Sequence, residues 1–175
     1  MTWKRSNPEA RLKPLLDILP LSIKSELWLD IGTGDGFFSN LMKNLHPKTI
    51  IVRSDISNRA NYSDLGLKSY IEKLGIRPRS LSGIICSQVL HYQNTNYQNK
   101  ILDILNTFLG IEGLLIIIEY EINHSYSWIP YPISQKYLIN YGRTSNIWNY
   151  YNSKRISDGH RTKFAVLLKK LSPKS

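Results

Sequence analysis

LWLDIGTGDGFFSNLM, which spans residues 27–42, decides the fold of this chain. An apolar run typical of a buried strand leads into a turn with three glycines, and apolar residues at helical spacing follow it. Gly32, Gly34 and Gly36 lack a Cβ, so the backbone of the turn can approach a ligand at the carboxyl end of the strand. The stretch therefore predicts a strand, a ligand-binding turn and a helix.

The charge of the turn separates two classes of cofactor. A dinucleotide fingerprint has its third glycine one residue after Gly36, where this chain has Phe37, and it holds a pyrophosphate at the helix N-terminus. Asp30 and Asp35 make this turn acidic. Carboxylates attract a cationic amine and a sulfonium and repel phosphates. The turn thus favours S-adenosylmethionine (SAM) over NAD, and disfavours an NAD-dependent enzyme.

Strand-like and helix-like runs alternate up to about residue 121, which predicts a parallel sheet built from βαβ units. A helix is expected over 97–109, with Gly110 placed to end it. The segment 62–78 fits no single pattern, and Tyr70-Ile71 belongs to either a short strand or a helix. The strand-like runs are 27–29, 49–52, 84–86 and 114–120.

The pattern changes after residue 121. A Pro-rich loop over 128–132 precedes a short helix at about 134–140. Two strand-like runs follow, 144–151 and 162–171, with the turn residues Ser157-Asp158-Gly159 between them. This order predicts an antiparallel hairpin at the end of the sheet.

The predicted fold class is α/β, with a Rossmann-like, mostly parallel sheet, helices on both faces and a C-terminal antiparallel hairpin. A chain of 175 residues fits one domain with one core. We expect three parts: an N-terminal helix within 1–24, capped by Ser6 or Asn7; cofactor-binding βα units over 25–121; and the Pro-rich loop, short helix and hairpin over 122–175.

The net charge of +10 is the one unusual bulk property. Basic residues are concentrated near the N-terminus and beyond residue 122, where Asp158 is the only acid. Such a field attracts RNA, DNA or a phosphorylated metabolite. A general lysine bias that favours solubility explains the same number equally well.

Other bulk features exclude several classes. No apolar run approaches the roughly 18 residues of a membrane span, and no secretory signal is recognised. A single cysteine, Cys86, excludes an internal disulfide and fits a reducing cytoplasm. No cluster of cysteine and histidine has the spacing of a metal site, so we expect no metal.

The stretch 27–42 resembles motif I of the class I SAM-dependent methyltransferases. The resemblance implies that Asp30, Gly32, Gly34 and Gly36 hold the methionine and ribose parts of SAM. The segment IIVRSDIS then places Asp55 at the end of the next strand, where the family's second acidic residue binds the ribose hydroxyls.

Four later segments extend the resemblance to about residue 171. IICSQVLHY resembles the strand and loop that face the reactive methyl group, which implies roles there for His91 and Tyr92. Gln88 lies in the same loop and is either structural or a cofactor-binding residue that faces the adenine. LLIIIEYE resembles the following strand, WIPYPIS a proline-aromatic loop, and RTKFAVLLKK the last antiparallel strand.

The chain departs from the family pattern in three places. Glu72 is the best placed acid for the adenine amino group, although no clear counterpart exists. Ser82-Gly83 stands where the family has a Phe-Asp pair. The short span from Asp55 to Ile84 indicates that one edge strand or helix is reduced.

Each acceptor-side residue has a functional and a structural interpretation. His91 is a candidate general base, or a hydrogen-bonded loop histidine. Tyr92, Tyr120, Trp128 and Tyr131 form an aromatic wall for a flat or cationic acceptor, or pack a Pro-rich loop. Glu119 and Glu121 bind substrate or form a solvated strand end, and buried Cys86 is expected to be a core residue.

The sequence as a whole predicts a cytoplasmic SAM-dependent methyltransferase that transfers a methyl group by direct displacement, most simply to a small molecule. Methylation of RNA or another polyanion is the alternative that the basic C-terminal part favours. A non-catalytic methyltransferase-like binding or partner subunit is the alternative that the missing adenine acid favours.

Overall fold

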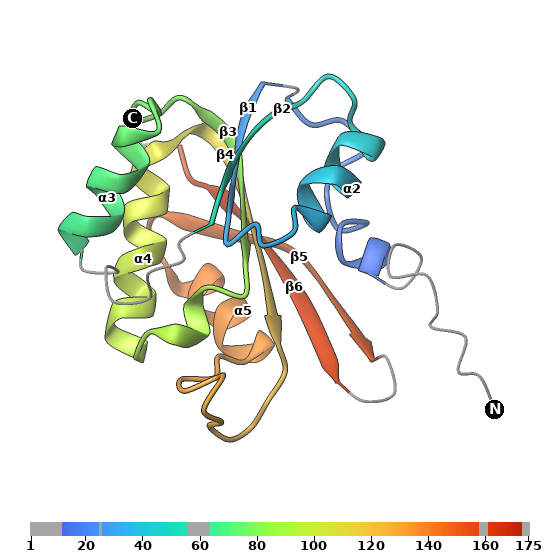
Figure 1. The fold of residues 1–175 in the computed structure, drawn as a ribbon, viewed down its shortest axis with the longest axis vertical. Coiled ribbons are helices and arrows are strands. Elements are labelled where there is room, and N and C mark those ends of the chain that lie inside the picture. Colours follow the sequence, from blue (N-terminus) through green and yellow to red (C-terminus); the bar gives the residue numbers. More distant parts are fainter. Residues whose placement is uncertain (1–11, 25, 56–63, 158–160, 173–175) are drawn as a thin grey trace.

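A computed structural model describes residues 12–24, 26–55, 64–157 and 161–172. These residues form a six-stranded sheet in the order β2-β1-β3-β4-β6-β5 (Figure 1). Neighbours among the first four strands are parallel, β6 is antiparallel to β4, and β5 is antiparallel to β6. The strands are β1 (Leu27–Ile31), β2 (Ile50–Ser54), β3 (Leu81–Ser87), β4 (Leu109–Tyr120), β5 (Trp148–Ser157) and β6 (Thr162–Lys170). The predicted fold class is confirmed.

Helices cover both faces of this sheet (Figure 1). The short turn η1 and α2 pack on one face, where Leu15, Leu41 and Met42 are buried. The other face carries α3, α4 and α5, which bury residues such as Ile71 and Leu102. The helical segments are η1 (Lys13–Leu15), α2 (Phe37–Leu45), α3 (Asp64–Lys73), η3 (Leu90–Tyr92), α4 (Thr95–Phe108) and α5 (Gln135–Thr144).

The glycine turn lies where the direction of the strand order reverses. From β1 the chain passes to β2 on one side and then to β3 on the other, with β1 between them. In open α/β sheets this reversal opens a crevice at the carboxyl ends of the strands. Within the described ranges no strand lies beyond β2. Part of the span where a reduced edge element is expected, residues 56–63, lies outside the described residues.

Three details differ from the sequence prediction or complete it. Gly110 does not end α4: the helix ends at Phe108, and buried Leu109 is already extended and begins β4. Gly110 lies instead in a register shift, where pairing passes from Leu81↔Leu109 to Gly83↔Leu114. Tyr70-Ile71 is helical, within α3.

Two predicted features fall wholly or partly outside the described residues. The predicted helix cap at Ser6 or Asn7 lies outside the described residues. The leucines expected on the inner face of that segment, from Leu12 to Leu19, are described and are buried. The predicted turn residues Asp158 and Gly159 also lie outside the described residues. The hairpin strands on either side of them are present as β5 and β6. Among the described helices none is long and apolar enough to cross a membrane.

Candidate functional site

The backbone of the glycine turn is fixed against two neighbouring strands. Gly32, Gly34 and Gly36 have φ angles of +76°, +51° and +79°, a region that residues with a Cβ rarely adopt. Gly32 N and Thr33 N donate to the carbonyl oxygen of Ser54, at 2.8 and 3.1 Å. The carboxyl end of β2 thus holds the start of the turn, and Asp55, the next residue, lies beside it.

Each glycine is needed for a different reason. A Cβ on Gly32 would lie 2.4 Å from Cγ2 of Val89, in the segment that follows β3. A Cβ on Gly36 would lie 2.8 Å from the guanidinium of Arg53. Gly34 is exposed, and a Cβ there would meet nothing within 4 Å. The protein itself therefore requires two of the glycines, whereas the space at Gly34 is open to a ligand.

Asp30 lies beneath the turn as a buried carboxyl group. It is only 1% exposed, and its Oδ2 accepts hydrogen bonds from the hydroxyls of Thr33, at 3.0 Å, and Ser39. Its Oδ1 has no hydrogen-bond partner among the described residues. Burial raises the pKa of Asp30, and the bonds from Ser39 and Thr33 and the charge of Arg53 partly offset that rise.

Arg53 makes the turn less acidic than the sequence alone indicates. Its guanidinium lies against Gly36 and donates to Oδ1 of Asn40 on α2. Asp35 and Asp55 are exposed, so the crevice has two solvated carboxylates on its rim and one cation against its wall. The contact between Arg53 and Gly36 joins β2 to the turn and has no local sequence signal.

The loop after β3 lies against the glycine turn from the side opposite β2. Gln88 has a φ of +56°, a strained conformation for a residue with a Cβ, and its backbone N–H donates to Ile118 O at 2.8 Å. The flanking Ser87 and Val89 are the residues that contact Gly32. The structure therefore brings Gln88 to the glycine turn, and backbone strain at that edge is a common mark of a functional site.

His91 is paired with a buried carboxylate. Its Nδ1 lies 2.6 Å from Oε2 of Glu119, and Oε1 of Glu119 accepts from Leu90 N at 2.9 Å. Both side chains are buried, so the expectation of a solvated strand end fails for Glu119. A carboxylate acceptor at this position favours the tautomer that carries its proton on Nδ1, which leaves Nε2 for another partner.

Cys86, in β3, lies near two buried carboxylates, Asp30 and Glu119, on the neighbouring strands β1 and β4. Burial raises the pKa of its thiol well above the ordinary value, and the charges of Glu119 and Asp30 raise it further. A thiol in this position stays protonated and is a poor nucleophile. The interpretation of Cys86 as a core residue is supported.

A buried amide ties the Pro-rich loop to the histidine. Nε2 of Gln98 donates to Leu90 O at 3.2 Å and to Tyr131 O at 3.0 Å, and Tyr131 N donates to His91 O at 3.0 Å. Tyr92 packs its ring 4.2 Å from that of His91. The sequence analysis did not identify Gln98, although a glutamine among the apolar residues of α4 is a usable signal.

An aromatic cluster stands at the carboxyl end of β4. The rings of Tyr120 and Trp128 meet edge-on at 5.4 Å, and Tyr126 stacks on Trp128 at 5.7 Å. Arg161 lies 4.7 Å from the Trp128 ring and Lys163 lies 4.9 Å from the Tyr120 ring. Trp128, Tyr126 and nearby Tyr131 are exposed. Tyr120 and Trp128 of the predicted wall thus lie together, with Lys163 of β6 and the preceding Arg161 against them.

Glu72 is not brought to this site. It is exposed in the last turn of α3, and the chain then runs through 74–80 to the start of β3 at the opposite edge of the sheet (Figure 1). Helices between parallel strands run back toward the amino ends, so a late position on α3 faces away from the turn. Within the described ranges, no group of three or more His, Cys, Asp or Glu residues is arranged for a metal ion.

No family model and no curated protein sequence matches the chain. Solved structures do resemble it. A SAM-dependent methyltransferase from Aquifex aeolicus is 17% identical to this chain with a TM-score of 0.60. The alignment covers 91% of this chain and 92% of the Aquifex chain. Another, from Archaeoglobus fulgidus, is 14% identical with a TM-score of 0.60, and the alignment covers 93% of each chain.

A third similar structure is the 1,6-didemethyltoxoflavin-N1-methyltransferase of Burkholderia thailandensis with bound S-adenosylhomocysteine, at 13% identity and a TM-score of 0.65. The alignment covers 97% of this chain and 81% of the Burkholderia chain. The chain spans only 57% of the first matched structure, an O-methyltransferase family protein from the same organism. Together with the strand order and the glycine turn, these similarities show that the chain has the fold of the class I SAM-dependent methyltransferases.

Proposed function

We propose that this protein binds SAM at the glycine turn and transfers its methyl group to a small-molecule acceptor. The observation that carries the proposal is the open, exposed backbone at Gly34, set at the strand reversal above a buried carboxyl group with an unpartnered oxygen. The similar structures methylate acceptors that include a toxoflavin precursor and mitomycin, which supports a small-molecule acceptor.

The residues around the turn suit the parts of SAM. Asp30 keeps a carboxyl oxygen without a partner, which would accept from a cationic ligand amine. Asp55 follows Ser54, whose carbonyl oxygen accepts from the turn, and would bind the ribose hydroxyls. Gln88, whose neighbours contact Gly32, would line the same site. Glu72 is left out of this set because it lies at the other edge of the sheet, so no acid is assigned to the adenine amino group.

On the acceptor side, the chain's own residues orient the substrate and hold a proton. Bound SAM supplies an electrophilic methyl group on a sulfonium, which is a good leaving group. His91, oriented by Glu119, presents Nε2 as the base that would take a proton from an acceptor hydroxyl or amine. Tyr92, Tyr120, Trp128 and Tyr131 would position a flat acceptor, since alignment provides much of the rate gain in a direct displacement.

The test is calorimetric titration of the purified chain with S-adenosylhomocysteine, together with a Gly34→Ala variant. A Cβ at Gly34 meets no atom of the protein within 4 Å, so apart from the cost of its positive φ the variant blocks only the ligand's approach to the backbone. We expect micromolar-range binding to the wild type and at least a tenfold loss in the variant, about 1.4 kcal/mol or more.

Gly75 provides a matched control. Its φ is +79° and a Cβ there also meets nothing within 4 Å, but it follows α3 at the other edge of the sheet. Gly75→Ala carries the same backbone cost, about 1–2 kcal/mol, and should bind the ligand as the wild type does. Absence of binding to the wild type at millimolar ligand would overturn the proposal. Binding with no methyl transfer to any pooled acceptor would favour the non-catalytic partner subunit.

We also propose a cytoplasmic location, on the ground that the buried thiol of Cys86 suits a reducing compartment.

A further inference from the structure

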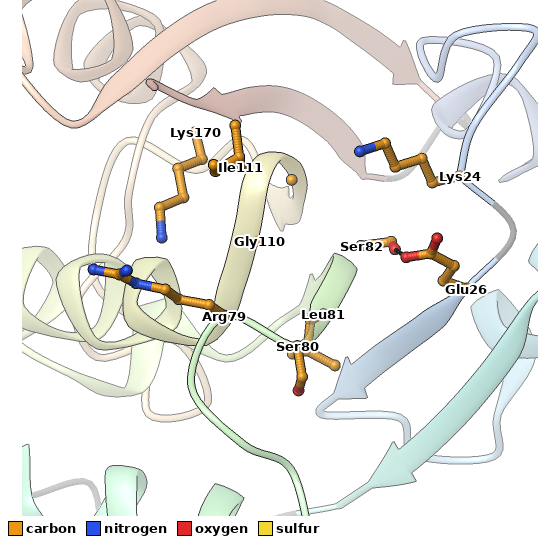
Figure 2. A pocket seen from close by; sticks show the side chains of 10 residues that line it. Lys24, Glu26, Arg79, Ser80, Leu81, Ser82, Gly110, Ile111 and Lys170 are labelled. Atoms are coloured by element: carbon orange, nitrogen blue, oxygen red, sulfur yellow. Dashed lines mark hydrogen bonds between the residues drawn. The ribbon is translucent and has the colours of Figure 1, made fainter. Parts of the chain in front are cut away.

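A cavity of about 360 Å³ opens at the amino ends of β1 and β3, the edge of the sheet opposite the glycine turn. Lys24, Arg79 and Lys170 contribute cationic side chains to its wall (Figure 2). The one acid in its lining, Glu26, already accepts a hydrogen bond from Ser82 at 2.9 Å.

A second cavity, of about 720 Å³, shares two of these cations. Arg79 and Lys170 line both cavities, and Lys68 of α3 joins them in the second. Asn106 and Asn146 add polar side chains, and none of the described residues that line this cavity carries a carboxylate. Both volumes fall within the range of about 300–1,000 Å³ that is typical of small-molecule sites.

Lys170 is held rigidly in this position. Its ammonium group donates to Asn106 O at 2.8 Å and to Leu109 O at 2.7 Å. An ammonium has three donors, so one N–H is left for another acceptor. Burial, and then the positive charge of Arg79, lower the pKa of Lys170, which means that the two cations lie close enough to repel each other.

Arg79 has no acid to offset that repulsion. Its backbone has a φ of +61°, and its N–H is fixed by a hydrogen bond to Thr107 O at 3.0 Å. No hydrogen bond or ion pair of its guanidinium is found among the described residues, and Figure 2 shows it pointing toward the Lys170 ammonium. Glu112, on the same edge, is paired with Lys169 at 2.9 Å.

We propose that Arg79, Lys170 and Lys68 form a binding site for a phosphate-bearing ligand at the amino edge of the sheet. An anion would relieve the repulsion between Arg79 and the fixed ammonium of Lys170, which no described carboxylate of the second cavity offsets. The planar guanidinium matches phosphate oxygens two at a time. This site lies apart from the proposed SAM crevice and does not depend on methyl transfer.

The test is titration of the full chain with inorganic tripolyphosphate and, separately, with a uridine oligonucleotide at two salt concentrations. Arg79→Asn removes the guanidinium, and asparagine tolerates the positive φ of this position. Lys68→Gln removes the cation that α3 contributes to the second cavity. We expect at least a tenfold loss of affinity in Arg79→Asn and a smaller loss in Lys68→Gln. Lys170 is left intact because it satisfies two backbone carbonyls.

Lys136→Gln is the matched control, since it removes one exposed charge at the start of α5, beside Glu121 at the carboxyl edge. It should bind both probes as the wild type does, and S-adenosylhomocysteine binding should be unchanged in all three variants. Loss in Arg79→Asn for tripolyphosphate alone assigns the site to small phosphorylated ligands. Loss for the oligonucleotide, with a steep salt dependence, assigns it to nucleic acid. Binding of neither probe, or equal binding by all variants, overturns the proposal.

Discussion

The two edges of one sheet carry opposite chemistry. At the carboxyl edge, Asp30 and Glu119 are buried acids with hydroxyl, imidazole and backbone donors around them. At the amino edge, Arg79 and Lys170 are cations that face each other with no acid between them. The buried acids at the cofactor turn and the two facing cations Arg79 and Lys170 therefore lie at opposite edges of the sheet.

This separation changes what the overall charge means. From the sequence, a basic chain with an acidic glycine turn is ambiguous between a SAM enzyme and a polyanion-binding protein. In the structure the two features occupy different edges, so one does not argue against the other. Phosphate repulsion at the turn, which Arg53 already reduces, leaves phosphate binding at Arg79 unaffected.

The largest expected effect comes from Glu119→Ala at the carboxyl edge. The substitution leaves Leu90 N and Nδ1 of His91 without their buried acceptor, and each unsatisfied buried donor costs about 1–3 kcal/mol. Urea denaturation at pH 7 measures the loss.

Glu26→Ala, at the amino edge, is the comparison for that measurement. Glu26 is exposed and accepts a hydrogen bond from the hydroxyl of Ser82, so we expect its removal to lower the free energy of unfolding by about 1 kcal/mol or less. Equal losses in the two variants would contradict the contrast between a buried acid at one edge and a solvated acid at the other.

The sequence predicted what local patterns determine. The strand, turn and helix around residues 27–42 follow from apolar spacing and glycine positions, and all three are confirmed. The terminal hairpin follows in the same way. Gly110 shows the limit, because a glycine after an amphipathic run is compatible with both a helix end and a strand, and only pairing with β3 decides.

The site features that the sequence did not predict depend on contacts between residues far apart in the chain. Glu119 is buried and pairs with His91, 28 positions earlier, and Arg53 lies against Gly36 because β2 brings it there. Glu72 was considered for its place in the sequence, but the direction of α3 carries it to the other edge. Spacing alone does not report which end of a helix faces a site.

A smaller effect is expected from Asp30→Asn, with a defined pH dependence. Because burial raises the pKa of Asp30 in the folded state, the folded protein binds a proton more tightly than the unfolded chain does. Wild-type stability therefore falls as pH rises from about 3.9, the unfolded value, through the higher folded pKa. The asparagine variant lacks this loss, so it should be the more stable protein at pH 7.

Melting temperatures of both proteins from pH 3.5 to 7.5 measure that difference. The gap should be smallest at low pH, widen as the carboxyl group ionises and then stay constant. A gap that widened toward acid would mean that the carboxylate is stabilised by Thr33 and Ser39 more than burial disfavours it. The same variant should bind S-adenosylhomocysteine more weakly, since a ligand amine loses its charged acceptor.

The smallest effect on stability is expected from Trp128→Ala, which tests the aromatic cluster at the carboxyl edge. Trp128 is 36% exposed and contacts Tyr120, Tyr126 and Arg161, so its removal should change the free energy of unfolding by about 0.5–1 kcal/mol at most. Tyr151→Ala, an exposed aromatic on β5, is the matched control. If the cluster positions the acceptor, only Trp128→Ala should reduce labelled methyl transfer from SAM to a pool of flat acceptors, while S-adenosylhomocysteine binds both variants equally. Equal transfer by the two variants would assign Trp128 to loop packing alone.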